Sequence, residues 1–481
     1  MSSARYGIVS RYGAVNAEEN NAQATSPPAP LFNRDAEILI ACKCVRMFGF
    51  GFLSVMLALY LSELTFTAEK IGLMFTLTLL GDAVISLGIT THADVFGRRK
   101  MLIIGALLAI LTTVVFITES NFWILTIAAV IGVITPSGNE IGPFMAIELS
   151  SLSQVTADAS RTHLMAWYTL AGCLSSAVGA LLCGFTLYFC QTADPALAQL
   201  TSYRLVLIMY LGTQILLSAL FINLSEKIEV PPAVEAKVGD MSNPVSVFLG
   251  LHKSKLLVLK LSALFMLDSF AGSFVLQTII SAWFHHTYGT SPEKLGALVF
   301  VCNIVAGVSA LFAASLADKI GLINTMVVTH VPSNILLILV PLMPNETSAI
   351  VVLCLRYSIS QMDVPTRNAY VQGVVDPDER SAANGITNVV RSIGAATGPF
   401  LAGLLYNSAY YTNFPWYIAG GLKIVYDLLL LYSMQQVRPV EEIEKAHLEK
   451  EELQRLTSTY TNSTASSLQG RDSEETLDNA V

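Results

Sequence analysis

Charged residues are scarce in this chain. Only 13% of its 481 residues are Asp, Glu, Lys or Arg, whereas 53% are hydrophobic. A soluble globular domain carries about 25% charged residues, so much of this chain cannot face water. The mean hydropathy of +0.57 agrees. This composition excludes an ordinary water-soluble domain, and the sequence holds no basic patch for nucleic acid.

Features that catalysis or cofactor binding would need are also missing. The seven histidines are scattered without the spacing of metal ligands. The seven cysteines lie in or beside apolar runs and lack paired spacing, so we expect them to be small buried packing residues. No G-x-x-x-x-G-K-S/T loop is present to bind ATP. We therefore expect no metal, no cofactor, no nucleic-acid partner and no enzymatic activity.

Long apolar runs, in contrast, are abundant. A helix needs about 20 consecutive apolar residues to cross the hydrocarbon core of a bilayer. Twelve runs qualify: 37–61, 70–92, 101–118, 123–147, 162–189, 203–222, 257–284, 295–316, 323–342, 349–372, 383–406 and 414–434. They exceed the roughly ten residues of a barrel strand, and backbone amides in lipid need partners within their own segment. We therefore predict an all-α membrane protein with twelve transmembrane helices.

Loop charges indicate how the chain is organised across the membrane. Positive residues gather after the second and sixth spans, and the positive-inside rule places those loops and both termini in the cytoplasm. We predict five segments: a cytoplasmic tail at 1–35, a six-helix bundle at 36–222, a cytoplasmic central loop at 223–255, a second six-helix bundle at 256–435, and an acidic, Ser/Thr-rich cytoplasmic tail at 436–481.

The two bundles repeat one another in sequence. Lys70, Gly72, Asp94 and Gly97 match Lys294, Gly296, Asp318 and Gly321 at an offset of 224, and Arg161, Gly179 and Gly184 match Arg380, Gly398 and Gly403 at an offset of 219. Such constant offsets indicate parallel repeats, a common construction in membrane transporters.

The loop after the second span carries a recognisable motif, T-H-A-D-V-F-G-R-R-K. It resembles the signature between helices 2 and 3 of the major facilitator superfamily, from which Thr90 and Val95 depart. Glycine permits a tight turn, aspartate can cap a helix start, and the basic cluster can anchor to inner-leaflet lipid or to an acid on a neighbouring helix. We expect a conformational latch formed by Asp94, Gly97, Arg98, Arg99 and Lys100, with a weaker copy at Asp318 and Gly321.

The resemblance covers roughly residues 36–435. It implies two six-helix bundles around a central cavity lined mainly by helices 1, 4, 7 and 10, with helix 12 at the periphery, and transport by alternating access. It specifies no substrate. The segment G-A-A-T-G-P at Gly394 to Pro399 resembles an element that exporters carry on helix 5, but here it lies in span 11. The alternative is that Gly394 and Gly398 simply allow close helix packing.

Ionisable and amide side chains inside the spans are candidates for the transport pathway. A charge at a helix centre costs about 2.5 to 3.5 kcal/mol on insertion scales, so it marks a functional position by default. The candidates for the substrate and proton pathway are Arg46, Asp82, Asn139, Glu140, Asp268, Arg356, Gln361, Asp363 and Arg391.

Arg46 and Asp268 form the pair that we expect to matter most. At 1.5 Å per residue both lie near mid-bilayer, on spans 1 and 7, which the family places at the cavity. In one access state the two side chains could bond directly across the interface between the halves, and in the other they would separate. Asp82 could instead satisfy Arg46 from the adjacent helix.

Prolines break the fourth span beside a carboxyl group. Pro136 and Pro143 each remove a helix amide around Glu140. This carboxyl either carries a proton or neutralises an arginine. In the repeat, Gln361 of span 10 stands opposite Asn139, so both halves present an amide for hydrogen bonding to a polar solute.

Other polar groups allow structural interpretations. The spacing of four residues favours structural pairs of Asp363 with Arg367 and of Lys423 with Asp427. Aromatic and amide side chains in membrane spans line cavities or join helices; those in question are Trp167, Tyr168, Gln277 and Asn303.

Together these patterns predict a secondary active transporter of a small solute. We expect alternating access coupled to protons through one or more of Asp268, Glu140 and Asp82. The alternative is a solute sensor with the same fold that binds without transporting, for which the acidic tail is the only support. We expect a monomer among membrane lipids, in the cell membrane rather than a vacuolar or other internal membrane.

Overall fold

The structure is a computed structural model of the whole chain. It describes residues 33–132, 134, 143–155, 158–193, 198–229, 251, 254–375, 379–407, 410–437 and 439. Within these ranges the side chains at 86–95, 143, 146, 153–155, 158–166, 314 and 380–382 lie outside the description. The described residues form helices and connecting turns, with no β-sheet.

The first half of the chain, here called the N half, contains seven α-helices and a short 3-10 helix. They are α2 (Arg34–Glu63), α3 (Ala68–Phe96), α4 (Arg98–Thr118), α5 (Phe122–Gly132), α6 (Pro143–Val155), α7 (Asp158–Ala193), α8 (Gln199–Ile222) and η1 (Glu226–Ile228). α5 and α6 are the two pieces of span 4. Residues 135–142, where the sequence predicts the proline break, lie outside the described residues.

The second half, here called the C half, repeats this order. It contains α10 (Lys255–Ser273), α11 (Gln277–Tyr288), α12 (Pro292–Ile320), α13 (Leu322–Leu339), η2 (Val340–Leu342), α14 (Glu346–Ser360), α15 (Asp363–Val374), α16 (Arg380–Tyr406) and α17 (Phe414–Met434). Span 7 is divided into α10 and α11, and span 10 into α14 and α15. Pro365 lies in the first turn of α15, where its missing amide is tolerated.

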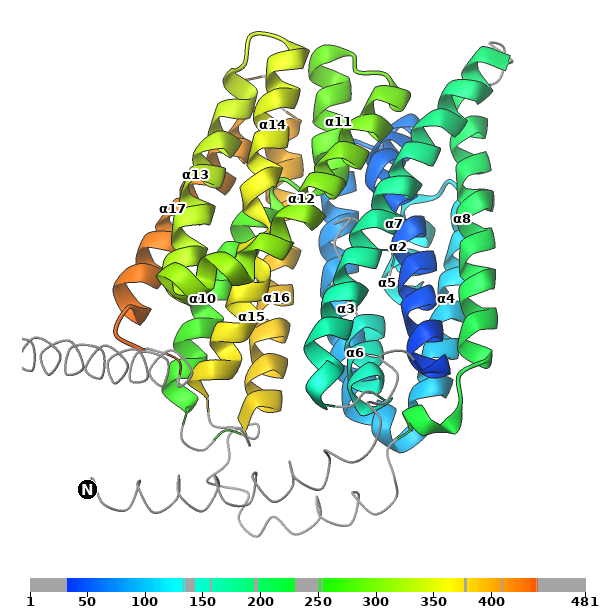
Figure 1. Ribbon diagram of the computed structural model, residues 1–481. Coiled ribbons are helices and arrows are strands. Elements are labelled where there is room, and N and C mark those ends of the chain that lie inside the picture. The colour runs from blue at the N-terminus through cyan, green and yellow to red at the C-terminus, as the bar shows by residue number, and fades with distance from the viewer. Residues whose placement is uncertain are drawn as a thin grey trace, which may run out of the picture.

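Length and composition support the twelve predicted spans. In the described part of the chain, nine helical segments are long and apolar enough to cross a membrane. The remaining spans are α3, the α5–α6 pair and the α14–α15 pair. Figure 1 shows the resulting two helical bundles side by side. We call the end at which α2 begins and α17 ends the terminal side, at the bottom of Figure 1, and the opposite end the distal side.

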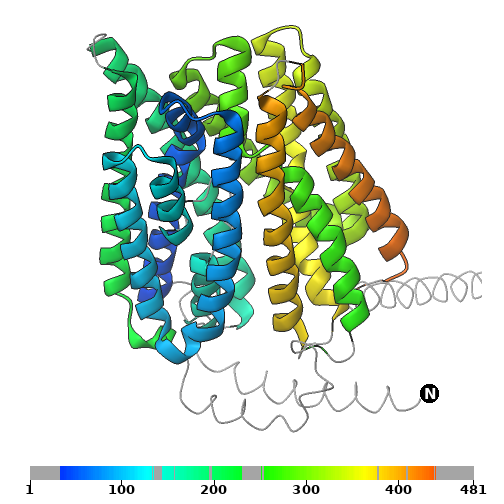
Figure 2. The same cartoon turned by 180° about the vertical axis from the view of Figure 1, so that it is seen from behind.

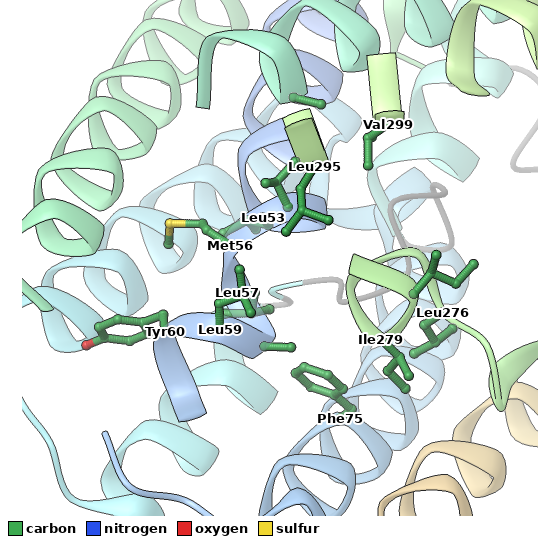
Figure 3. Close-up of a cluster of buried hydrophobic side chains, with 14 of the residues drawn as sticks. Leu53, Met56, Leu57, Leu59, Tyr60, Phe75, Leu276, Ile279, Leu295 and Val299 are labelled. Carbon is green, nitrogen blue, oxygen red and sulfur yellow. The ribbon is translucent and has the colours of Figure 1, made fainter. Parts of the chain in front are cut away.

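Three apolar cores hold the bundles together, and only one of them crosses between the halves. The shared core lies toward the distal side and joins α2 and α3 to α11 and α12; Figure 3 shows Leu57 and Phe75 of the N half near Ile279 of the C half. Toward the terminal side each half has its own core. The core of the N half lies around Leu102 and Phe221, and that of the C half lies around Phe265 and Leu430. The described cores therefore join the halves distally and leave them separate at the terminal side.

Glycines bring the halves into backbone contact along two seams. α7 packs on α12, and α3 packs on α16, a pair seen side by side in Figure 2. A Cβ atom on Gly296 would collide with the carbonyl oxygen of Ala180, and one on Gly72 with that of Pro399. Only glycine allows such approach. Because 72 and 296 differ by 224, and 180 and 399 by 219, the two seams are equivalent in the internal repeat.

The glycines of span 11 also serve close packing. A Cβ atom on Gly394 would meet the carbonyl oxygen of Met266 at 2.5 Å, and one on Gly398 would collide with the side chain of Ser273. Both contacts lie between α16 and α10. Close helix packing at these two glycines is therefore confirmed.

Replacing Gly296 with alanine tests the seam. We expect Gly296→Ala to lower the free energy of unfolding by about 1 to 3 kcal/mol, the usual penalty of overpacking. Gly212→Ala is the control, because a Cβ atom there meets nothing within 4 Å, and alanine favours the helix by about 1 kcal/mol. Thermal unfolding in detergent measures both. Equal stabilisation by the two substitutions would contradict the seam.

Candidate functional site

A buried ion pair links the first and fourth spans of the N half. Arg46 of α2 donates to both carboxylate oxygens of Glu148 of α6, with 2.6 Å between Nη2 and Oε2. The hydroxyl of Tyr168 donates to the same Oε2 at 2.5 Å. The Nζ atom of Lys43 lies 4.6 Å from the centroid of the Tyr168 ring. All four residues are buried, and the two-pronged contact of Arg46 fixes its orientation.

A second, larger cluster lies inside the C half around Asp268 of α10. Lys423 of α17 donates to its Oδ1 at 2.5 Å, and Arg367 of α15 to its Oδ2 at 3.2 Å. Arg367 also contacts Asp363 at 3.1 Å, which is the structural pair expected from their spacing. Two carboxylates and two basic groups therefore share one buried site.

A histidine extends this cluster toward α13. The Nε2 atom of His330 lies 4.0 Å from Asp268 Oδ1, and its Nδ1 atom lies 2.8 Å from Asp427 Oδ1. Asn334 donates to the other oxygen of Asp427 at 3.0 Å. His330 thus stands between two carboxylates, within hydrogen-bond distance of Asp427 and 4.0 Å from Asp268.

The two clusters correspond in the repeat, but their charges are reversed. In the N half a base on span 1, Arg46, pairs with an acid on span 4, Glu148. In the C half an acid on span 7, Asp268, pairs with a base on span 10, Arg367. Each half therefore carries one buried ionic tie between its first and fourth spans, on the spans that the family resemblance assigns to the cavity.

The expected pair between Arg46 and Asp268 is not formed in this structure. Each side chain bonds within its own half, to Glu148 and to Lys423 with Arg367 respectively. The physical reason is that a closer partner within the same bundle satisfies each charge without crossing the interface. The sequence argument missed this because it passed over Glu148 and gave Arg367 only a structural role with Asp363.

Span 12 also differs from the expectation. Lys423 and Asp427 do not bond to one another; Lys423 contacts Asp268, and Asp427 contacts His330 and Asn334. Both side chains are buried, so α17 contributes to the interior of the C half rather than being purely peripheral. Spacing of four residues allows a pair, but partners on other helices are closer here.

Several predicted site residues form no ion pair with the described members of the two clusters. Asp82 is buried in α3, and Gln361 is half-buried where α14 ends. Asn139 and Glu140 lie outside the described residues. Arg391 of α16 donates from Nε to Ser269 Oγ at 3.3 Å, and the guanidinium carbon of Arg356 of α14 lies 5.0 Å from the Tyr357 ring centroid.

Sequence reasoning missed Lys43, Glu148, His330 and Asn334. The sequence does mark Glu148 as a candidate site residue, because this acid follows Pro143 in an otherwise apolar stretch. His330 and Asn334 lie four residues apart around Pro332 in span 9, a spacing that puts two polar groups on one helix face. Their shared partner, Asp427, is 97 residues from His330, and no local pattern indicates that contact.

Amide side chains form hydrogen bonds between helices near the distal core, and one of these bonds crosses between the halves. Gln277 of α11 donates to Asn303 of α12 at 3.1 Å, and Asn303 donates to Ser176 of α7 at 3.3 Å. These residues therefore act as polar contacts between helices. Tyr168 belongs to the N-half cluster, and Trp167 is exposed.

The motif after span 2 holds the start of α4 against the end of the N half. Gly97 has φ 99°, and Gly321, its repeat partner, has φ 85°, so both turns need glycine. The carboxylate of Glu229 accepts from the backbone N–H of Arg98 at 2.7 Å and of Arg99 at 3.1 Å. An acid at a helix start is stabilised by the helix dipole. The side chain of Asp94 lies outside the described residues, and Lys100 and Asp318 are exposed.

One apolar groove lies on the outside of the N half. It has a volume of about 440 Å³ and runs between α3 and α5, beside Val84 and Trp123. Its lining is apolar apart from Thr126. Such a surface suits lipid chains and not a polar solute.

Comparison with known proteins places this geometry in a family. The sequence profile of the Major Facilitator Superfamily matches residues 39–362 and 269–465. An uncharacterised membrane protein of Saccharomyces cerevisiae is 28% identical over 422 residues, covering 83% of this chain and 93% of the relative.

Solved transporters share the fold at low sequence identity. The crystal structure of a D-xylose–proton symporter has a TM-score of 0.65 at 13% identity, covering 84% of this chain and 98% of the symporter. That of a nucleoside transporter has a TM-score of 0.64 at 14% identity, covering 82% and 99%. The paired six-helix halves, the glycine turns and the family profile agree, and the chain belongs to the Major Facilitator Superfamily.

Proposed function

We propose that this protein is a secondary active transporter that moves a small solute by alternating access, coupled to a proton gradient. The observation that carries the proposal is the arrangement of the three cores. The halves share a core distally and have separate cores at the terminal side. That is the packing expected of a state open toward the terminal side. The solved transporters of similar fold support a solute as the cargo.

Hydrogen bonds of neutral groups cross between the halves at the distal side. Ser281 Oγ donates to the Ser54 carbonyl at 3.1 Å, and the Ala58 amide donates to Thr278 Oγ1 at 3.1 Å. A typical intramolecular hydrogen bond contributes only about 1 kcal/mol net. In our proposal the halves rock along the glycine seams, so that these contacts open while the terminal ends close.

Proton coupling is assigned to the Asp268 cluster, with Asp82 and Glu140 as further carriers. Protonation of Asp268 would remove the negative charge that Lys423 and Arg367 share, and so would weaken the tie between spans 7, 10 and 12. His330 lies between Asp268 and Asp427 and can relay the proton. Proton binding and helix rearrangement are coupled in this way.

The orientation follows from the loop charges. Arg98, Arg99 and Lys100 lie at the terminal side, where α4 begins. The positive-inside rule assigns such a cluster to the cytoplasm. We therefore propose that both tails and the open side face the cytoplasm, and that the monomer works in the cell membrane.

Neutralising the pathway acids tests proton coupling. Once a screen of deletion and overexpression strains has supplied a transported solute, we expect Asp268→Asn to reduce pH-driven accumulation in proteoliposomes at least about tenfold, with solute exchange retained, because a group that cannot ionise carries no proton. Asp82→Asn and Glu140→Gln are tested alongside. Glu346→Gln is the control, since this acid pairs with the exposed Lys294 at 3.3 Å.

Unchanged coupling in all three acid variants would reject the proton scheme. Solute binding without flux in the wild type would favour the sensor function instead.

The buried Arg46–Glu148 tie gives a separate prediction. We expect Glu148→Gln to lower the free energy of unfolding by about 3 to 5 kcal/mol, because it leaves Arg46 buried without its charge partner. The double variant Arg46→Met/Glu148→Leu removes both charges and is expected to unfold near the wild-type temperature. Thermal denaturation in detergent compares them. Equal losses in the single and double variants would contradict an ion pair.

A further inference from the structure

Two arginines inside the C half form no ion pair with any residue that the structure describes. Within the described residues, Arg46 and Arg367 each contact a carboxylate, but Arg356 and Arg391 do not. Both lie within membrane-spanning helices, where an uncompensated charge is strongly unfavourable. A negatively charged ligand that binds and dissociates can balance these charges where the protein itself does not.

Arg391 faces the interior of the C half. It precedes Gly394 by three residues and Gly398 by seven, so the three share one face of α16. The backbone at both glycines touches α10, and Arg391 itself donates to Ser269 of α10 at 3.3 Å. The guanidinium therefore points toward α10 and away from lipid.

The acids near Arg391 are already engaged. Asp268 accepts from Lys423 and Arg367, and Asp363 accepts from Arg367. Arg391 lies close enough to both acids and to Arg367 to feel their charges, but its one hydrogen bond in the described structure goes to a neutral hydroxyl. This leaves most of its donors available.

Arg356 also faces inward, from the other side of the C half. It follows Ala349 by seven residues and Leu353 by three and precedes Ser360 by four, all buried, so it shares their face of α14. The opposite face exposes Val351 and Leu355. The Nε atom of Arg356 is buried and has no hydrogen-bond partner, and its guanidinium lies over the Tyr357 ring.

The acids of the two described clusters are already engaged. Glu148, Asp268 and Asp363 each bond to an arginine or lysine, and Asp427 bonds to His330 and Asn334. A cationic solute would need a spare carboxylate, and these four offer none. A guanidinium presents five donors in a fork that fits a carboxylate or a phosphate.

We propose that the transported solute is an organic anion whose carboxylate or phosphate groups engage the donors of Arg356 and Arg391. This inference rests on the proposed transport function and names its substrate class. Ser269 assists as a neutral donor beside Arg391. The anion supplies acceptors for the guanidinium donors that the described acids leave unused, and its arrival near Asp268 links solute binding to the ion pairs of that cluster.

Ligand-induced thermal stabilisation of the purified full-length protein tests the substrate class. The probes are matched pairs: succinate with succinamide, glucose 6-phosphate with glucose, and inorganic phosphate with chloride. We expect at least one organic anion to raise the melting temperature while its neutral partner does not. Arg356→Gln and Arg391→Gln should each weaken that response at least tenfold in ligand concentration, and Arg→Lys at either site should weaken it less. Arg34→Gln, at an exposed position, should leave it unchanged.

A readout without ligand makes the test independent of the choice of probe. Because the unpaired charge destabilises the empty protein, Arg391→Gln should melt at a higher temperature than the wild type when no anion is added. The inference is overturned if no anion acts on the wild type, if both glutamine variants keep the wild-type response, or if Arg391→Gln melts lower without ligand.

Uptake in proteoliposomes separates this inference from the proposed function. Transport of a neutral or cationic solute at wild-type rates by both glutamine variants would overturn the anion class and leave the transporter intact. Absence of flux for every solute found in the screen would reject the transporter itself.

Discussion

Pairing of charges inside the bilayer is the constraint on which this structure depends. An isolated buried charge is too unfavourable to persist without a partner or a function. In the N half, Arg46 and Glu148 tie span 1 to span 4, and in the C half Asp268 and Arg367 tie span 7 to span 10. The same architectural position thus carries opposite signs in the two repeats. Ion pairs between side chains of the same half hold the helices of that half together, so each half can move as a unit.

Packing between the halves follows a different rule. Where the halves meet, the contacts that the structure describes are apolar or made by backbone and neutral side chains, such as Ser281 with Ser54. Glycines at repeat-related positions bring α3 to α16 and α7 to α12. Halves joined in this way can rock on one another, and protonation of Asp268 loosens the tie within the C half during that movement. This is the mechanical basis of the transport that we propose.

Much of the fold was predictable from the sequence, and the site much less so. Apolar runs gave the helices, and the motif with Gly97 gave the family, because both are local patterns read along the chain. Ion-pair partners are not local: Glu148 lies 102 residues from Arg46, and Lys423 lies 155 residues from Asp268. Only the pair four residues apart, Asp363 with Arg367, was available to pattern reasoning. The break in span 10 has a local signal, because Pro365 lies in the first turn of the helix that follows it.

Distances between spin labels on the two halves, measured with and without a transported solute, test the central claim most directly. One pair sits at the terminal side, Lys100→Cys with Ile320→Cys, and the other at the distal side, Glu119→Cys with Thr347→Cys, all at exposed positions. Rocking of rigid halves predicts that the solute increases the population with a shorter terminal distance and a longer distal one. Distances that stay fixed, or that change in the same direction at both ends, would contradict it.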